Sequence, residues 1–127
     1  MWNGKRIVEN LVLVVDDELS IREVLSALLC TKGYSVLEAA NGQEALEVLE
    51  KSANFPRIIL LDLSMPIMNG RSFLEIRAKN PFLRQIPVVV VSGSPASGEP
   101  IKGIAAYLRK PVNFDRLMAA VIVAASG

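Results

Sequence analysis

Histidine is absent from this sequence of 127 residues, and cysteine occurs only once. The lack of histidine excludes histidine-based acid–base catalysis, most zinc sites and any step in which this chain itself carries a phosphohistidine. The single cysteine, Cys30, excludes an internal disulfide bond. Because Cys30 lies in an apolar helical pattern, we expect it in the core. A protein without a disulfide bond suits the reducing cytoplasm, where we expect this one.

Long apolar runs and an excess of one charge are also missing. No segment approaches the roughly 20 apolar residues that a membrane-spanning helix needs, and residues 1–6 lack the apolar region of a signal peptide. With 14 basic and 13 acidic residues, the charge is too balanced for a nucleic-acid interface. We therefore expect no membrane and no nucleic-acid partner. The length indicates a single domain over residues 1–127, with its core from about 11 to 124.

The sequence does contain a carboxylate at the end of an uninterrupted apolar run, because Asp62 follows Ile58–Leu61 directly. Continuous aliphatic runs are typical of buried parallel strands, and open α/β sheets bind ligands at the carboxyl ends of such strands. The alternative is that Asp62 caps the next helix. Pro66 and Gly70 separate it from that helix, so a nucleophile or a metal ligand is the favoured interpretation.

A second apolar run, residues 11–15, ends in Asp16, Asp17 and Glu18. If the two strands are neighbours, three or four carboxylates meet at one edge of the sheet and repel one another. A hard divalent cation relieves this repulsion, and Mg²⁺ fits best because it takes one or two carboxylates and keeps several waters. The alternative is an acidic N-terminus for a helix that begins near residue 19, which fits Glu18 and could also fit Asp17.

Two further strand ends carry a hydroxyl and a cation. Ser92 follows Val88–Val91, and Lys110 follows a short apolar stretch and precedes Pro111. A lysine at this edge would pair with the carboxylates, and its ammonium group also suits a phosphoryl oxygen. Taken singly, such residues are more often a turn serine and a solvated lysine. An acid pair, an acid, a hydroxyl and a lysine at four strand ends in chain order indicate one shared site.

Extended and helical patterns alternate along the chain, which predicts an α/β fold with a parallel sheet and right-handed crossovers. We expect the apolar residues Val24, Ile76 and Ile122 to face the core from three of the helices. The predicted strands are residues 11–15, 34–38, 57–62, 87–92 and 105–109, and the predicted helices are residues 19–32, 43–52, 70–79 and 113–125.

Together, these features resemble a response-regulator receiver domain, the phospho-accepting unit of two-component signalling. The likeness runs from about residue 11 to residue 124. It implies a flavodoxin-like, doubly wound sheet of five parallel strands in the order 2-1-3-4-5, with helices on both faces. The matching residues are Asp16 and Asp17, Asp62 within residues 61–70, Ser92, Tyr107, and Lys110 with Pro111.

The resemblance also implies a role for each acid. Asp62 would attack phosphorus and become an aspartyl phosphate. Asp17 would bind Mg²⁺ directly, Asp16 would hold it through water, and Ser64 would supply its backbone carbonyl. Phosphoryl transfer depends mainly on positioning and on charge neutralisation, and a metal ion contributes to both.

The remaining matches imply a switch and its partners. Lys110 and the Ser92 hydroxyl would contact the phosphoryl oxygens, and Tyr107 would move inward when that hydroxyl is drawn to them. The implied partners are a histidine kinase or a histidine phosphotransfer protein, a downstream protein and, after phosphorylation, a second copy of the chain. Such a protein is cytoplasmic and catalyses only its own phosphorylation and dephosphorylation.

One region departs from the family pattern. The interval from Ser92 to Lys110 is a few residues shorter than in most receivers, and residues 93–103 are rich in glycine and proline. This composition opposes a helix of more than about one turn, so we expect the fourth helix to be short or absent. Either the phosphoryl group orders a mobile loop here, which we favour, or output passes through another surface such as the first helix.

Three rival classes compete with a phosphorylated receiver. A haloacid-dehalogenase-type phosphohydrolase would need a second aspartate two residues after Asp62, where this chain has Ser64. A flavodoxin-like cofactor binder would need a Ser/Thr/Gly-rich phosphate loop where residues 16–18 are acidic. A receiver-like docking scaffold that acts without phosphorylation typically loses an acid or the lysine, and this chain keeps them all. The scaffold is the main competitor.

Overall fold

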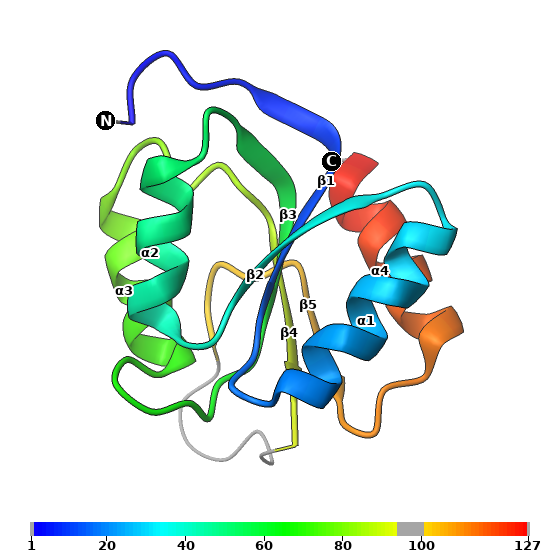
Figure 1. Cartoon of the computed structure of the whole chain (residues 1–127). Coiled ribbons are helices and arrows are strands. Elements are labelled where there is room, and N and C mark those ends of the chain that lie inside the picture. The colour runs from blue at the N-terminus through cyan, green and yellow to red at the C-terminus, as the bar shows by residue number, and fades with distance from the viewer. Residues whose placement is uncertain (1, 94–100, 127) are drawn as a thin grey trace.

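Five parallel strands and four helices make up the part of the chain that the structure describes, and they alternate as far as β4 (Figure 1). The structure is a computed structural model, and it describes residues 2–93 and 101–126. The strands are β1 (Ile7–Val15), β2 (Ser35–Ala39), β3 (Phe55–Leu61), β4 (Val88–Ser92) and β5 (Ala106–Arg109). The helices are α1 (Leu19–Thr31), α2 (Gly42–Lys51), α3 (Gly70–Lys79) and α4 (Phe114–Ser126).

The sheet has the strand order β2-β1-β3-β4-β5, and every pair is parallel, which confirms the predicted topology. β1 and β3 lie side by side, and Val15 is in register with Leu61 at their carboxyl ends. The next residues along these strands are Asp16 and Asp62. Their adjacency follows from the strand order, because the carboxyl ends of parallel strands meet at one edge of the sheet.

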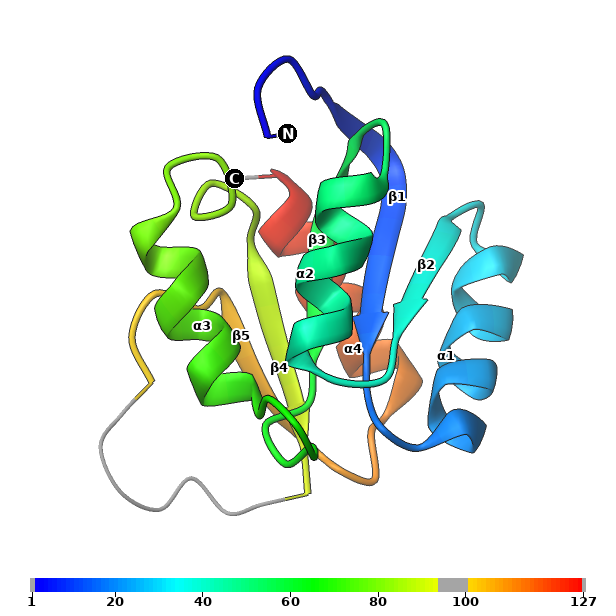
Figure 2. The same cartoon turned by 60° about the vertical axis from the view of Figure 1, so that its left-hand side comes forward.

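Side chains of the strands alternate between two helical layers. Val12 and Val14 of β1 pack with α1 and α4, whereas Leu13 and Val15 pack with α2 and α3. Figures 1 and 2 show these two helix pairs on opposite faces of the sheet, as predicted. Because both faces are covered, both sets of side chains are apolar, and the strands appear in the sequence as uninterrupted apolar runs.

A tight loop leads from the end of β3 into α3. The side-chain oxygen of Asn69 accepts the N–H of Ser72 at 2.9 Å and so caps the helix. Asp62 is therefore not the cap, and the capping alternative is wrong. Gly70 has no Cβ, and a Cβ there would meet the carbonyl of Asp62 and the backbone of Leu63. Glycine lets α3 start against the strand end and so positions the loop that follows Asp62.

The first strand begins at Ile7, earlier than the predicted start at residue 11. Its first part pairs with Phe55 before a register irregularity interrupts the ladder. Glu9 and Asn10 are exposed and break the apolar pattern in this part of the strand. Apolar periodicity alone therefore detects only the buried half of β1.

Several side chains predicted to lie in the core are exposed. In α1, the buried positions are Leu25 and Leu29. Successive residues of a helix are turned by about 100°, so the position beside a buried one falls near the edge of the apolar stripe or outside it. The exposed residues for which the prediction was wrong are Cys30, Val24, Ile76 and Ile122.

The connection from β4 to β5 contains no helix within the described residues, Gly93 and 101–105. The predicted short or missing fourth helix falls mainly on residues 94–100, which lie outside the described residues. The label α4 therefore denotes the helix that follows β5, and not the predicted fourth helix between β4 and β5. Within the described ranges, no helix has the length and apolarity needed to cross a membrane.

Candidate functional site

Three carboxylates converge where β1 and β3 end. Asp16 and Asp17 follow β1, Asp62 follows β3, and one side-chain oxygen from each lies within 4.8 Å of the others. Asp16 and Asp62 are buried, with exposed fractions of 3% and 5%, whereas Asp17 is exposed. The cluster therefore lies at the boundary between the core and the solvent.

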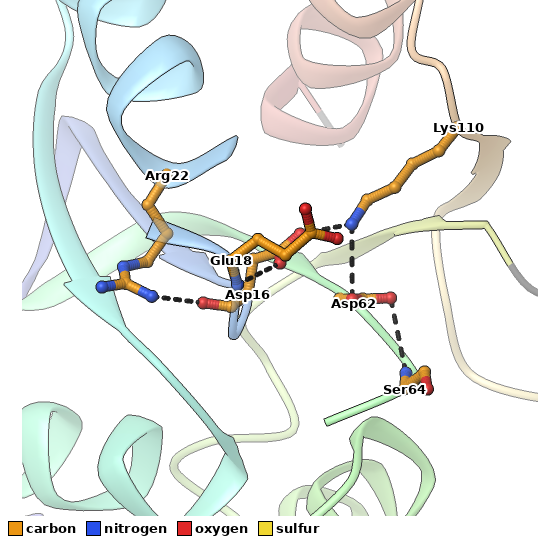
Figure 3. A network of polar contacts seen from close by, with 6 residues as sticks. All are labelled: Asp16, Glu18, Arg22, Asp62, Ser64 and Lys110. Carbon is orange, nitrogen blue, oxygen red and sulfur yellow. Dashed lines mark hydrogen bonds and ion pairs between the residues drawn. The ribbon is translucent and has the colours of Figure 1, made fainter. Parts of the chain in front are cut away.

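Lys110 extends from the end of β5 toward two of these acids (Figure 3). Its Nζ lies 2.6 Å from Oδ2 of Asp16 and 3.3 Å from Oδ2 of Asp62. Burial lowers the pKa of Lys110, but the hydrogen bonds and charges of the two acids outweigh this, and the pKa is raised. Because the folded pKa is the higher one, the contribution of Lys110 is fully present below about pH 10.4, as long as the acids are ionised, and is lost as pH rises through the folded pKa.

Asp16 is held by hydrogen bonds on both its backbone and its side chain. Its N–H donates to the carbonyl of Ala39 at 3.0 Å, and its Oδ1 accepts the N–H of Glu18 at 2.9 Å. Glu18 occupies the N-cap position of α1 but makes no side-chain capping bond. The acidic-cap alternative thus fits Glu18 by position only, and it does not fit Asp17.

Asp62 is oriented by the neighbouring strand and by its own loop. Its N–H donates to the carbonyl of Val15 at 2.9 Å, which continues the β1–β3 ladder by one residue. The N–H of Ser64 lies 3.4 Å from Oδ1 of Asp62, while Oδ2 faces Lys110 (Figure 3). Ser64 itself is exposed. The two oxygens of the buried carboxylate therefore have different neighbours, one a backbone amide and the other an ammonium group.

Ser92 and Tyr107 lie on the strands beside this cluster. Ser92 is the last residue of β4 and is fully buried, and its carbonyl accepts the N–H of Lys110 at 3.0 Å. Tyr107 is in register with Val90 and packs against the core between the sheet and the α2–α3 layer. The structure thus brings Ser92 to the same edge of the sheet as the acids, with Tyr107 further back on the next strand.

The donor set fits a hard divalent cation. The three acids offer only carboxylate oxygens as ligand atoms. Mg²⁺ is bound in proteins through one or two carboxylates with water completing its shell. Negative charge in the cluster exceeds the single positive charge of Lys110, so a cation there would reduce repulsion among the acids.

One contact at this site was not predicted from the sequence. Arg22 of α1 donates from Nη1 to the backbone carbonyl of Asp16 at 2.7 Å (Figure 3). It also donates from Nε to Glu38 at 3.3 Å. An arginine early in an amphipathic helix normally indicates a solvated side chain. The only sequence feature that could have indicated this contact is the position of Arg22 in the first turns of the helix after the acid pair.

Comparison with known protein families gives a match over most of the chain. Residues 12–122 match the family model described as Response regulator receiver domain. This range runs from within β1 into α4 and includes all of the predicted site residues.

Individual relatives agree with this match. The chain is 32% identical over 116 residues to the sensor histidine kinase CheAY of Helicobacter pylori and 37% identical over 110 residues to the transcriptional regulatory protein ZraR of Escherichia coli. These alignments cover 87% and 85% of this chain but only 14% and 24% of the relatives. A receiver domain protein from Clostridium thermocellum superimposes with a TM-score of 0.79 and 30% identity, covering 91% of this chain and 94% of that one.

Proposed function

The chain belongs to the response regulator receiver domains of two-component signalling, and on this premise we propose that it accepts a phosphoryl group on Asp62 in a Mg²⁺-dependent reaction. One observation carries the proposal. Asp62 is a buried carboxylate at a strand end, and it shares that edge with two further acids and a lysine. Partly buried clusters of charged side chains are typical of functional sites.

Asp62 acts as the nucleophile in the proposed transfer. One of its carboxylate oxygens bonds to phosphorus while the bond from phosphorus to the donor breaks. With a phosphohistidine donor, the electron pair of the P–N bond stays on the ring, which leaves as neutral imidazole when its second nitrogen is protonated. Lys110, with Nζ 3.3 Å from Asp62, is close enough to neutralise charge on the transferred group.

The acid pair and the loop after Asp62 would hold the metal. Under this proposal Asp17 would bind Mg²⁺ directly, Asp16 would hold it through water, and Asp62 and the backbone carbonyl of Ser64 would be further ligands. The ion supplies charge neutralisation and orients the phosphoryl oxygens when it is bound. The oxygen-only donor set and the excess negative charge support these assignments.

The proposed consequence of phosphorylation is a change in partner binding. The Ser92 hydroxyl contacts the phosphoryl group and Tyr107 follows it inward, which biases two conformations of the β4–β5 region. A histidine kinase or histidine phosphotransfer protein supplies the group, and a downstream protein or a second copy of the chain detects it. The chain would catalyse only its own phosphorylation and dephosphorylation. The main alternative is a docking scaffold that functions without phosphorylation.

Incubation with acetyl phosphate and Mg²⁺ is expected to add one phosphoryl group to the wild-type protein, as measured by intact-protein mass. Acetate leaves as the Asp62 oxygen bonds to phosphorus. Tryptic cleavage yields a peptide of residues 58–71 in which Asp62 is the only acidic residue, so the adduct can be located there. Borohydride reduces an acyl phosphate but not a phosphoserine, which separates Asp62 from Ser64.

A matched sample with the metal removed by a chelator is expected to show no adduct. No adduct in a folded, Mg²⁺-loaded protein would contradict the proposed function and favour the docking scaffold. An adduct of equal extent with and without Mg²⁺ would contradict the assignment of the acid cluster as a metal site.

Mg²⁺ is expected to raise the melting temperature of the wild-type protein, and to raise that of Asp17→Asn much less. A ligand at ten times its Kd that binds only the native state stabilises it by about 1.4 kcal/mol, which for a domain of this size is a rise of several degrees. Asp17→Asn removes a proposed ligand and part of the repulsion. The quantity to compare is therefore the shift on adding Mg²⁺ at constant ionic strength, measured by thermal unfolding. Equal shifts in the two proteins would argue against the site.

A further inference from the structure

The backbone carbonyl of Asp16 lies beyond the regular ladder of the sheet. On one side of β1, the N–H of Asp16 donates to Ala39 of β2; on the other, the carbonyl of Val15 accepts the N–H of Asp62. The Asp16 carbonyl instead accepts Nη1 of Arg22 at 2.7 Å (Figure 3). This is a short, charge-assisted hydrogen bond, which is a stronger kind than a bond between neutral groups.

The guanidinium group of Arg22 is itself held in place. Its Nε lies 3.3 Å from Oε1 of Glu38 on β2, and its side chain is only 15% exposed. The N–H of Arg22 donates to the carbonyl of Glu18 at 3.1 Å in the first turn of α1. Arg22 therefore links the start of α1, the end of β1 and the edge strand β2, and its donors are ordered before any ligand binds.

The Asp16 carbonyl belongs to the peptide bond between Asp16 and Asp17. A peptide unit is planar, so an anchor on its carbonyl oxygen restrains the plane that also contains the N–H and the Cα of Asp17. The carboxylate of Asp16 has its own anchors at Glu18 and Lys110, whereas Asp17 is exposed. The orientation of Asp17 thus depends on how well its backbone is held.

We propose that Arg22 is a positioning residue for the metal site. It acts through the Asp16 carbonyl to hold the Asp16–Asp17 peptide, so that both carboxylates are presented to a divalent cation together. The inference rests on the proposed function, because it assigns Arg22 to the same Mg²⁺ site. Groups that orient metal ligands typically change metal affinity by 10- to 100-fold when they are removed.

Arg22→Met is expected to weaken Mg²⁺ binding about tenfold in isothermal titration calorimetry. In the metal-free protein, the same variant is expected to show faster amide hydrogen exchange at Asp17 and Glu18 than wild type, while core strands keep their protection. Arg22→Lys keeps the charge but replaces the planar fork of donors with a single ammonium group. We expect its Mg²⁺ affinity to lie between those of wild type and Arg22→Met.

Arg57→Met is the matched control, because Arg57 is also a partly buried arginine that donates to a backbone carbonyl, that of Ala125, but lies far from the acids. This control is expected to keep the wild-type Mg²⁺ affinity whatever its melting temperature. Wild-type Mg²⁺ affinity in folded Arg22→Met, or in Arg22→Lys should the methionine variant not fold, overturns the role of Arg22. Absence of Mg²⁺ binding by the wild-type protein would overturn the metal site itself. The experiment therefore distinguishes failure of the proposed function from failure of the proposed role of Arg22.

Discussion

Asp62→Asn is expected to carry no phosphoryl adduct under conditions in which the wild-type protein is modified. Asparagine has nearly the same shape as aspartate, but its amide oxygen is uncharged and is a poor nucleophile. Asn at this position can still accept the N–H of Ser64, which lies 3.4 Å from Oδ1 in the wild-type structure. The loss is therefore expected to be chemical and complete, since catalysis here depends on the nucleophile itself.

The same substitution is expected to leave the metal-free fold at least as stable as wild type. The Asp62 carboxylate is buried beside Asp16, and both acids share the one ammonium group of Lys110. Removing one of two like charges reduces repulsion and the cost of burying charge. Lys110 keeps its closer partner, Asp16, at 2.6 Å. Thermal unfolding without Mg²⁺ measures this directly.

Asp115→Asn provides the matched control, because Asp115 is an exposed acid in the first turn of α4. It makes the same chemical change away from the site and is expected to leave the phosphoryl adduct intact. An adduct that persists in Asp62→Asn would show that another acid is the acceptor, with Asp16 and Asp17 as the first candidates. If Asp62→Asn without Mg²⁺ unfolds at a much lower temperature than wild type, repulsion between the buried acids does not destabilise the metal-free protein.

The strands and the acids that follow them were predictable because local sequence patterns indicate both. Runs such as residues 12–15 and 58–61 are apolar on both faces, which is typical of a parallel strand covered on both sides. In the observed order β1 lies beside β3, and this brings Asp16 and Asp62 together without any further contact being known. The family resemblance supplied the strand order.

Contacts between segments far apart in the chain were not predictable in this way. The ring of Trp2 stacks on Phe55 with centroids 6.4 Å apart, and Nζ of Lys5 lies 5.5 Å from the Trp2 ring. The same Nζ donates to the carbonyl of Leu49 at 2.6 Å, near the end of α2. A cation near the last carbonyls of a helix is favourable. Residues 1–6 alone contain no pattern that indicates these partners.

Helix α3 shows the same limit for burial. Apolar periodicity predicted Ile76 in the core, yet Ile76 is exposed and the next residue, Arg77, is 6% exposed. A buried arginine is stable only where its donors are satisfied. The acceptors here are backbone carbonyls, which are the same in every residue type and leave no signal in the sequence. Burial of Arg77 is therefore a property of the assembled fold.

Arg77→Met is expected to lower the free energy of unfolding by about 3 kcal/mol, because bonds to a buried charged donor are worth roughly 1.5–3 kcal/mol each and their acceptors remain partly buried. Nη2 of Arg77 lies 2.7 Å from the carbonyl of Ile86 and 3.1 Å from that of Arg84, and Nη1 lies 3.3 Å from that of Gly103. Burial lowers the pKa of Arg77, but a guanidinium group stays protonated. In a domain of this size the expected loss corresponds to a fall in melting temperature of roughly 10 °C.

The positions of these carbonyls imply that Arg77→Met loosens one region of the fold in addition to lowering the stability of the whole domain. Ile86 and Arg84 lie before β4, and Gly103 lies before β5, so Arg77 joins α3 to both strand entries. The strand β5 leads directly to Lys110, whose ammonium group pairs with the acids. We therefore expect faster hydrogen exchange in β5 of Arg77→Met than in β1, and slower phosphorylation by acetyl phosphate even where the protein is folded.

Lys79→Met separates this effect from the general loss of a cation at the end of α3. Lys79 is an exposed basic residue in the same last turn as Arg77, and its interaction with the helix dipole is worth only about 0.3–1 kcal/mol. Its melting temperature should stay within a few degrees of wild type. If the melting temperature of Arg77→Met falls no further than that of Lys79→Met, the buried carbonyls find other partners. That result would contradict the proposed coupling through Arg77 between α3 and the end of the sheet that carries Lys110.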